Sequence, residues 1–418
     1  DTLGCGLGQR MSTGSKGIAR PTIEIANTGE KHIIDGVEME FVYVLDTEAP
    51  VEIMVWLPQL KAFCTAEDMT HNMHNLQTLR GAKVRNGLLW SKAIDTAIER
   101  YGDQVEVSFS THHWPTWGNE RIVDYWEAQR DMYRYLHDQT LHLANRGLTP
   151  DEIAEEMKLP ASLASQFNCR GYYGTLSHNV KAQYDLYFGW FNGNPAHLNP
   201  LPPSELGSKY VEAIGGADKV LEVAKASYAK GEYRWVATLL DNLVFAEPEN
   251  KEARRLLADT YTQLGYQAES GPWRNFYLTG ARDLFKKDVP YTSQLINDGV
   301  LAQMDMGTLL DYCAIQLNGE KAAGKEAVIN INFTDTKEKV MLMLNNGVLN
   351  HRLDSQDEKA DLTLEIEKMD FIKLFFGRTD LQTLLKTNKV RTTGNTQAMD
   401  VICSAYEPAD PNFKIVLP

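Results

Sequence analysis

The chain has 418 residues, a formal net charge of −14, and ordinary globular proportions of 43% hydrophobic and 23% charged residues. This length predicts two to four domains, each able to bury a core. The acidic balance argues against a main role in binding nucleic acid or an anionic membrane surface, because both partners require a basic footprint. No apolar run approaches the roughly 20 residues that span a bilayer, so we expect no transmembrane segment.

The N-terminal third alternates between β-type runs and polar loops. After a Gly- and Ser-rich stretch over residues 1–20, the pattern predicts one helix near Ser91–Tyr101 and a series of strands. The strands are expected at Thr22–Ile25, Val37–Leu45, Val51–Leu57, Lys61–Cys64 and Val105–Phe109. Several of these runs end in acidic or His residues, which favours an α/β layer architecture with a site at the strand ends.

The middle of the chain has helical spacing. A helix is predicted over Ile122–Arg146 and ends before Gly147, and Thr149-Pro150-Asp151-Glu152 is a capping box that begins the next helix. A Pro- and Asn-rich stretch, Asn194–Pro203, interrupts the helices. Beyond it, Ala224 pairs with Ala258 and Gly231 with Gly265 at a weak 34-residue offset, which is typical of tetratricopeptide-like helix pairs. Since only about two units fit, we expect them to pack on neighbouring helices.

The pattern changes again around Asp288–Ser293. Strict alternation predicts strands around residues 329–333, 340–344 and 362–366, and Asn345-Asn346-Gly347 predicts a hairpin turn. Helices are expected near residues 369–376 and 381–385. These elements indicate an α+β domain with one apolar sheet face. That face could line a channel for a ligand, but a sheet core is the favoured interpretation.

Three strand ends carry side chains that can bind metal. Glu48 follows one strand, Glu67 and Asp68 follow the next, and His112-His113 follows a third. A single turn Glu or strand-end His is usually structural, and the constellation is what points to a metal site.

The segment over residues 66–81 is also rich in ligand types. His71 and His74 are three residues apart and could share a helical face, but a capped helix start with solvated polar residues explains the spacing equally well. Asn75 and Arg80 offer amide and guanidinium donors for an oxyanion, although Arg80 could equally form a surface ion pair.

The remaining candidates are aromatic residues, one histidine and the cysteines. His178, Tyr172 and Tyr173 could line the site or simply pack in a core. The aromatic residues of the predicted helices are interpreted as core or dimer contacts; they are Tyr125, Trp126, Tyr133, Tyr187 and Trp190. The five cysteines are scattered, without the spacing of a zinc knuckle or a disulfide framework, and are interpreted as buried free thiols; they are Cys5, Cys64, Cys169, Cys313 and Cys403.

Four segments together resemble the zinc-dependent alkylsulfatases of the metallo-β-lactamase superfamily. They are Ala66–Ala82, His112–Gly118, Arg170–Asn179 and Ser270–Leu278. The resemblance covers nearly the whole chain and implies a multidomain α/β plus α plus α+β protein. Residues 1–118 would be the C-terminal half of a metallo-β-lactamase αββα domain. Residues 119–287 would form a helical, tetratricopeptide-like dimerisation domain, and residues 288–418 a sterol-carrier-protein-like domain.

The resemblance also implies roles for individual residues. Glu48 would bind one zinc ion, Glu67 would bridge two, and His112, taken over His113 because it comes first after the strand, would bind the second. Asn75 and Arg80 would hold the substrate sulfate, and no catalytic residue is assigned.

In the family, a His-x-His-x-Asp-His cluster precedes a Leu-Gly-x-Gly-Leu-Gly loop. Here that loop is Leu3–Gly8, so the cluster is expected to lie outside this chain. We therefore expect an incomplete ligand set, with a sheet that exposes an edge and an apolar face.

The implied function is hydrolysis of linear alkyl sulfates, such as detergents, to alcohol and sulfate by a homodimeric sulfuric ester hydrolase. Two zinc ions in the complete enzyme would supply an activated water molecule. The family favours a periplasmic or secreted location. Two alternatives stay open at this point. One is a non-catalytic truncated dimer that binds an apolar ligand through its C-terminal domain, and the other is an enzyme whose N-terminal piece is separate.

Overall fold

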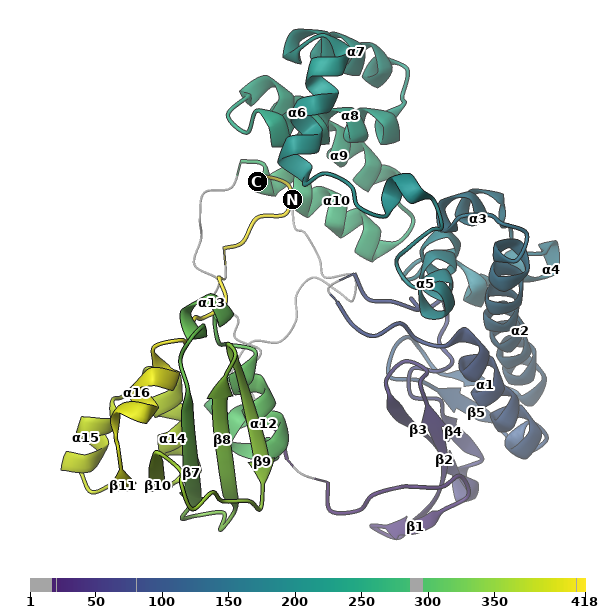
Figure 1. Ribbon diagram of the computed structural model, residues 1–418. Helices are drawn as coiled ribbons and strands as arrows, with labels where there is room; N and C mark the ends of the chain where they lie inside the picture. Colours follow the sequence, from purple (N-terminus) through teal and green to yellow (C-terminus); the bar gives the residue numbers. More distant parts are fainter. Residues whose placement is uncertain (1–16, 20, 80, 286–295, 411) are drawn as a thin grey trace. The chain divides into compact units, whose positions relative to one another are not determined.

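The computed structural model describes residues 17–19, 21–79, 81–285, 296–410 and 412–418 (Figure 1). The chain divides into two compact units. The first contains residues 23–285 and the C-terminal residues 414–418, and the second contains residues 17–22 and 296–413. The predicted change of pattern at Asp288–Ser293 and the Leu3–Gly8 loop lie outside the described residues, as does Cys5.

The first unit begins with a six-stranded sheet whose strands follow chain order. They are β1 (Lys31–Ile34), β2 (Val37–Leu45), β3 (Val51–Leu57), β4 (Ala62–Cys64), β5 (Val107–Phe109) and β6 (Thr116–Trp117). Only the β4–β5 pair is parallel, because the chain crosses over through α1 (Gly87–Tyr101) between them. The sheet shares a buried core with α1 and with α2 (Asn119–Ala144), which includes Met54, Trp56, Phe63, Trp90 and Trp126.

The two faces of this sheet differ in burial. Alternate residues of β2 and β3, such as Val42 and Met54, enter the core shared with α1 and α2. On the opposite face Leu45 pairs with Val51, and their exposed fractions are 49% and 53%. The end of this face at Leu45 and Val51 is therefore exposed in the described structure, whereas Phe41 on the same face is buried. The expected exposure of an apolar face is observed only in part.

Helices make up the rest of the first unit. They are α3 (Pro150–Glu156), α4 (Ala161–Ala164), α5 (Leu176–Phe188), α6 (Pro203–Ile214), α7 (Ala217–Ala229), α8 (Tyr233–Ala246), α9 (Lys251–Gln267) and α10 (Gly271–Asp283), with short 3-10 turns at Phe167–Cys169 and Pro195–His197. The capping box at Thr149 is present as predicted. The starts of α7 and α9 follow the 34-residue offset, but its two glycines differ. Gly231 lies in a turn with φ of 79°, whereas Gly265 is buried within α9.

The second unit is an α+β fold built on a five-stranded sheet of order β11-β10-β7-β8-β9. The strands are β7 (Ala327–Phe333), β8 (Lys339–Asn345), β9 (Val348–Leu353), β10 (Leu362–Ile366) and β11 (Val390–Gly394). The helices are α11 (Asp298–Gln303), α12 (Met306–Ala314), α13 (Gly319–Ala322), α14 (Lys368–Phe375), α15 (Leu381–Lys386) and α16 (Gln397–Cys403). Asn346 and Gly347 both have positive φ, 54° and 78°, as a two-residue hairpin turn requires. The apolar face forms a core with these helices, so the sheet-core interpretation is confirmed.

Three local predictions need correction. Thr22–Ile25 is not a strand, and the edge strand β1 lies at Lys31–Ile34, where it pairs with β2. The described residues between β4 and α1 form no helix, so His71 and His74 do not share a helical face. Cys64 and Cys403 are free but only partly buried, whereas Cys169 and Cys313 are free and buried as expected. None of the helices described here is long and apolar enough to cross a membrane.

Candidate metal centre and adjoining pocket

The candidate site is built on an irregular but buried loop between β4 and α1. The backbone N–H and C=O groups of this loop do not form the hydrogen bonds of a helix or sheet. Side chains from three helices bond to them instead. Trp90 Nε1 of α1 donates to the carbonyl oxygen of Asp68 at 2.7 Å. Gln129 Nε2 of α2 donates to Asn72 at 3.0 Å, and the His74 amide donates to the Tyr133 hydroxyl at 3.2 Å.

Asn179 of α5 and Gly174 clamp the loop around His74. Asn179 Nδ2 donates to the carbonyl oxygen of His74 at 2.9 Å, and its Oδ1 accepts from the Leu76 amide at 2.8 Å. The Gly174 amide donates to the carbonyl oxygen of Met73 at 2.8 Å. A Cβ atom on Gly174 would lie only 2.4 Å from the His74 carbonyl oxygen, so this close approach requires glycine. The position of His74 is therefore determined by contacts distant in sequence.

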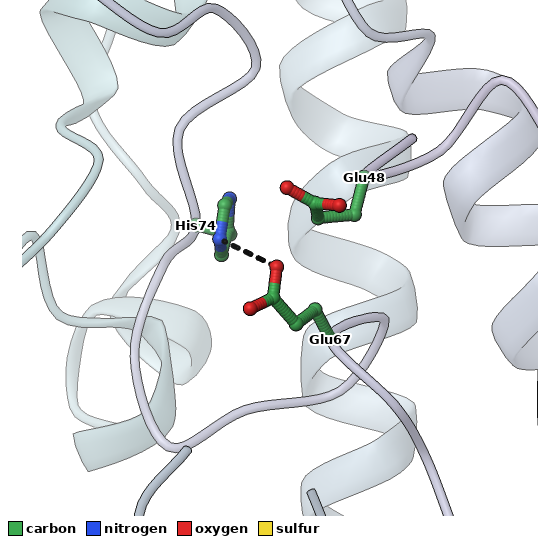
Figure 2. A group of neighbouring side chains, drawn as sticks. All are labelled: Glu48, Glu67 and His74. Atoms are coloured by element: carbon green, nitrogen blue, oxygen red, sulfur yellow. Dashed lines mark ion pairs between the residues drawn. The ribbon is translucent and has the colours of Figure 1, made fainter. Parts of the chain in front are cut away.

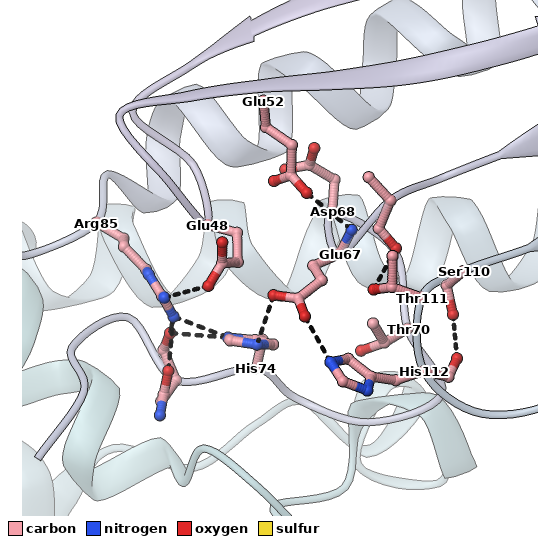
Figure 3. A network of polar contacts seen from close by, with 12 residues as sticks. Glu48, Glu52, Glu67, Asp68, Thr70, His74, Arg85, Ser110, Thr111 and His112 are labelled. Atoms are coloured by element: carbon pink, nitrogen blue, oxygen red, sulfur yellow. Dashed lines mark hydrogen bonds and ion pairs between the residues drawn. The ribbon is translucent and has the colours of Figure 1, made fainter. Parts of the chain in front are cut away.

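Glu48, Glu67 and His74 point toward one another and can each offer one ligand atom, all within 4.8 Å of one another (Figure 2). Glu67 uses its two carboxylate oxygens differently. Oε2 lies 3.8 Å from Nε2 of His74, and Oε1 lies 2.5 Å from Nε2 of His112 (Figure 3). One imidazole therefore lies beside each carboxylate oxygen of Glu67.

Arg85 orients three neighbours of this group. One guanidinium nitrogen donates to Glu48 (Figure 3). The other nitrogen donates twice to Asn75, to Oδ1 at 2.7 Å and to the carbonyl oxygen at 2.9 Å. Nδ1 of His74 lies 3.1 Å from the guanidinium of Arg85 and also 3.1 Å from the carbonyl oxygen of Asn75. When Nδ1–H donates to that carbonyl, Nε2 keeps its lone pair on the Glu67 side, which is the tautomer that a metal ligand needs.

The buried setting shifts the proton affinities in opposite directions. Burial, followed by the charge of Arg85, lowers the pKa of His74 to about 4, so that its imidazole is neutral at neutral pH. Burial alone would raise the pKa of Glu67, but attraction to His74 in its protonated form and hydrogen bonds with Glu48 and His112 lower it overall. A neutral imidazole beside an ionised carboxylate is the donor set that binds a divalent cation.

A second pair of carboxyl groups, those of Glu52 and Asp68, lies near Glu67, and both have a raised pKa. Burial raises the pKa of Glu52 to about 7. The backbone hydrogen bond from Glu67 opposes this increase, and the negative charge of Glu48 adds to it. Burial also raises the pKa of Asp68 well above its usual range, and the charge of Glu52 adds to it. Asp68 is fully buried and is therefore not a solvated partner of Glu67.

A pocket of about 320 Å³ adjoins this centre. Its lining is Asn75, Thr78, Leu79, Tyr173, Pro272, Asn275, Phe276, Thr279, Gly280, Asp283, Ile415 and Val416. The ring of Tyr173 lies 4.8 Å from the ring of His74, centroid to centroid, so the pocket begins beside the metal ligands. A volume of this size is at the lower end of those that hold small organic ligands.

Two alkylsulfatase family models match the chain, "Alkyl sulfatase dimerisation" over residues 149–287 and "Alkyl sulfatase C-terminal" over residues 294–418. A linear primary-alkylsulfatase from Pseudomonas sp. (strain ATCC 19151) is 30% identical over 98% of the chain, which covers 78% of that relative. The chain belongs to the alkylsulfatase family.

Other alkylsulfatases are more similar but longer. A linear primary-alkylsulfatase from Pseudomonas sp is 45% identical over all of this chain, which spans 62% of that relative's length. The solved structure of the stereoselective inverting sec-alkylsulfatase Pisa1 from Pseudomonas sp. is 41% identical, covers 96% of this chain and superposes with a TM-score of 0.92. The match covers 63% of the Pisa1 chain. The predicted α/β plus α plus α+β composition is confirmed, while the domain bounds at 118, 119, 287 and 288 stay a prediction.

The structure brings most of the predicted site residues of this alkylsulfatase chain together. Glu48 and Glu67 lie in one group, and His112 contacts Glu67. His113 has positive φ and its Nε2 faces the amide of Asn72 at 3.1 Å, so the two adjacent histidines serve different neighbours. Arg80 lies outside the described residues. Whether Glu48, Glu67 and His112 bind metal stays a prediction.

Sequence reasoning did not include His74 among the ligands. The only signal was its place in a segment rich in carboxylate and imidazole groups, and nothing in its spacing separates it from His71. In the structure His71 instead stacks between Trp114 and Tyr125, with ring centroids 5.0 Å and 5.2 Å away. His71 therefore has a packing role.

The other candidates also divide by position. Tyr173 lines the pocket, whereas Tyr172 is partly exposed under the guanidinium of Arg170. His178 accepts from Trp273 Nε1 at 3.0 Å and lies 2.5 Å from the carbonyl oxygen of Gln77, so both of its nitrogens are engaged. It borders a neighbouring pocket of about 290 Å³.

Proposed function

We propose that this alkylsulfatase chain contributes part of a binuclear zinc centre that hydrolyses linear alkyl sulfate esters to alcohol and sulfate. The observation that carries the proposal is Glu67, with one carboxylate oxygen toward His74 and the other toward His112. Glu48 completes a compact group of ionised and neutral donors. The chain spans about 62% of the length of a linear primary-alkylsulfatase that it matches, so the activity belongs to the whole protein rather than to these residues alone.

The donor set fits zinc. Catalytic zinc takes about three protein ligands from imidazole and carboxylate groups and keeps a position open. Glu48, Glu67 and the two histidines are groups of these kinds, and the lowered pKa of His74 keeps its imidazole unprotonated. Bound zinc ions would lower the pKa of a water molecule and offset the negative charge of the sulfate group.

Residues of this chain would hold and orient the ester. Because Arg85 donates to Oδ1 of Asn75, the amide NH₂ of Asn75 is fixed on the opposite side, where it can donate to a sulfate oxygen. Arg80 would add a bidentate guanidinium contact to the same group. Asn75 lines the pocket, which would take the alkyl chain at ~0.8 kcal/mol per buried methylene.

The helical region also supports the proposal, because it matches a dimerisation domain of alkylsulfatases. The match of residues 149–287 to the "Alkyl sulfatase dimerisation" model supports a homodimer formed through the helical region. The second unit would be the sterol-carrier-like part, and its apolar sheet face is already occupied by its own helices.

The test is metal content and turnover on the purified chain, with matched variants. Zinc per chain is measured by elemental analysis and by titration, and sulfate release is measured with dodecyl sulfate. Glu67→Gln is expected to lower zinc affinity at least tenfold, because it removes the negative charge of the proposed ligand that lies beside both His74 and His112. Glu365→Gln is the control, since Glu365 is an exposed glutamate of the second unit, with Oε2 3.8 Å from Nη1 of Arg391.

Equal zinc binding by the two variants would overturn the proposal. Near-zero zinc in the unmodified chain, together with a retained dimer and retained binding of an apolar ligand, would instead favour the non-catalytic binding protein. Zinc binding without sulfate release would show that this chain holds its ligands but needs the remaining part of the enzyme for turnover.

A further inference from the structure

The pocket beside the metal centre runs along one face of α10. Six lining residues come from this helix and follow the i, i+3, i+4, i+7, i+8, i+11 pattern. They are Pro272, Asn275, Phe276, Thr279, Gly280 and Asp283. This spacing places all six on the same side of the helix. From Pro272 to Asp283 the helix rises 1.5 Å for each of 11 residues, so the pocket is a groove of about 17 Å.

One end of the groove lies at the metal centre. Ser270, the N-cap of α10, donates to the carbonyl oxygen of Tyr173 at 2.7 Å, and the Gly271 amide donates to the carbonyl oxygen of Tyr172 at 2.9 Å. The Tyr173 ring in turn contacts His74. The first turn of α10 is therefore bonded to Tyr172 and Tyr173, and Tyr173 in turn packs against the loop that carries His74 and Asn75.

The other end of the groove is bordered by the C-terminal residues of the chain. Ile415 and Val416 line the pocket, and Cγ1 of Val416 lies 3.6 Å from the position of a Cβ atom on Gly280, three residues from the end of α10. Leu417 holds this segment in place, since it is 7% exposed and packs in the helical core that also contains Leu284. Ile415 stays largely exposed, with 72% of its surface accessible, so it stands at the rim.

We propose that Ile415 and Val416 mark the far end of the covered part of the groove and thereby set the length of alkyl chain that the groove shields from water. The inference rests on the proposed function, because it takes the groove as the binding site for the tail of a sulfate ester whose head lies at Asn75. Val416 lies beside Gly280, eight residues and about 12 Å along α10 from Pro272. With ~1.5 Å carbon–carbon bonds an extended chain advances about 1.25 Å per methylene, so it reaches Val416 after roughly 10 carbons. Longer chains extend past Val416 into solvent.

The test is binding of n-alkyl sulfonates of 8 to 18 carbons, which keep the anionic head but have no ester bond, measured by calorimetry below their micelle concentrations. Each added methylene is expected to lower Kd about fourfold, the equivalent of ~0.8 kcal/mol, until the chain reaches Val416. Beyond roughly 10 carbons the Kd levels off. Val416→Trp narrows the far end and moves this plateau to shorter chains, and Val416→Ala moves it to longer ones.

Two further variants separate this inference from the proposed function. Asn75→Ala is expected to raise Kd by a similar factor for every chain length, because it removes a head-group contact. Val348→Trp is the control for the bulky substitution, since Val348 is an exposed valine of the second unit. Thermal unfolding of each variant verifies that it folds.

The outcomes are distinct. A length-dependent series with the same plateau in both Val416 variants overturns the role of the C-terminal segment and leaves the proposed function standing. A series with no dependence on length, or no binding at all, overturns the inference, and zinc titration of the same protein then tests the proposed function separately. A plateau that moves with Val416 but not with Val348 supports the inference.

Discussion

Gly174→Ala tests whether close backbone packing positions the candidate metal ligands. The added Cβ would lie 2.4 Å from the carbonyl oxygen of His74, 2.6 Å from its carbonyl carbon and 2.8 Å from the amide nitrogen of Asn75. Ordinary carbon–oxygen contacts are about 3.3 Å or longer, so the two segments must separate by about 1 Å. The loop cannot yield without loss, because Asn179 and Tyr133 hold the same peptide groups.

Two costs follow from that separation. Overpacking of this kind costs about 1–3 kcal/mol of folding free energy, and a weakened buried hydrogen bond from Asn179 adds about 1 kcal/mol. His74 also moves relative to Glu67 by more than the ~0.5 Å that a preorganised site tolerates. We therefore expect zinc affinity to fall by about 10- to 100-fold and the unfolding midpoint to fall by several degrees.

The assay is zinc titration against a competing chromophoric chelator, with thermal unfolding measured in parallel. Gly307→Ala is the matched control, because a Cβ on Gly307 meets its nearest atoms at 3.4 Å and 3.7 Å, which are ordinary contacts. Wild-type zinc affinity in Gly174→Ala, with an unfolding midpoint equal to that of Gly307→Ala, would refute the reasoning. It would mean that the ligand loop is not held by this approach.

Three other side chains give measurable outcomes. The pKa of Glu52 is raised from 4.5 to about 7, so the unfolded chain loses this proton first and stability falls as pH rises between these values. In metal-free protein, Glu52→Gln should remove up to about 3 kcal/mol of this pH-dependent decrease in the free energy of unfolding. A pH profile of the unfolding midpoint that is the same in the variant would contradict this prediction. Asn179→Ala leaves two buried backbone groups of the loop unsatisfied and should cost about 2–4 kcal/mol in chemical unfolding, whereas a cost below about 1 kcal/mol would mean that the clamp is unimportant. Thr149→Ala removes the capping box of α3 and should cost about 1 kcal/mol, with Thr149→Ser as the conservative control that retains most of it.

Local patterns alone were sufficient for several elements. Val37–Leu45 and Val51–Leu57 were predicted with the bounds that the structure has, because alternation and a turn rich in polar residues are properties of neighbouring residues. The Thr149 cap and the Asn346-Gly347 hairpin turn depend on a few adjacent side chains in the same way. The Thr22–Ile25 run failed for the opposite reason. A short alternating stretch becomes a strand only when a partner strand is available to it, and β2 pairs with Lys31–Ile34 instead.

The sequence by itself therefore determined several of the regular elements, the acidic and His-bearing strand ends, and the resemblance to alkylsulfatases. Only the tertiary structure decided how the ligand loop runs, since it has no periodicity to read and its described backbone is satisfied from elsewhere. Tyr133 and Asn179, which hold His74, are 59 and 105 residues away in the chain. The same is true of the pocket, where α10 and the C-terminal residues meet the loop that carries Asn75. Contacts between segments so distant leave no spacing in the sequence, because their geometry exists only after the helices have packed.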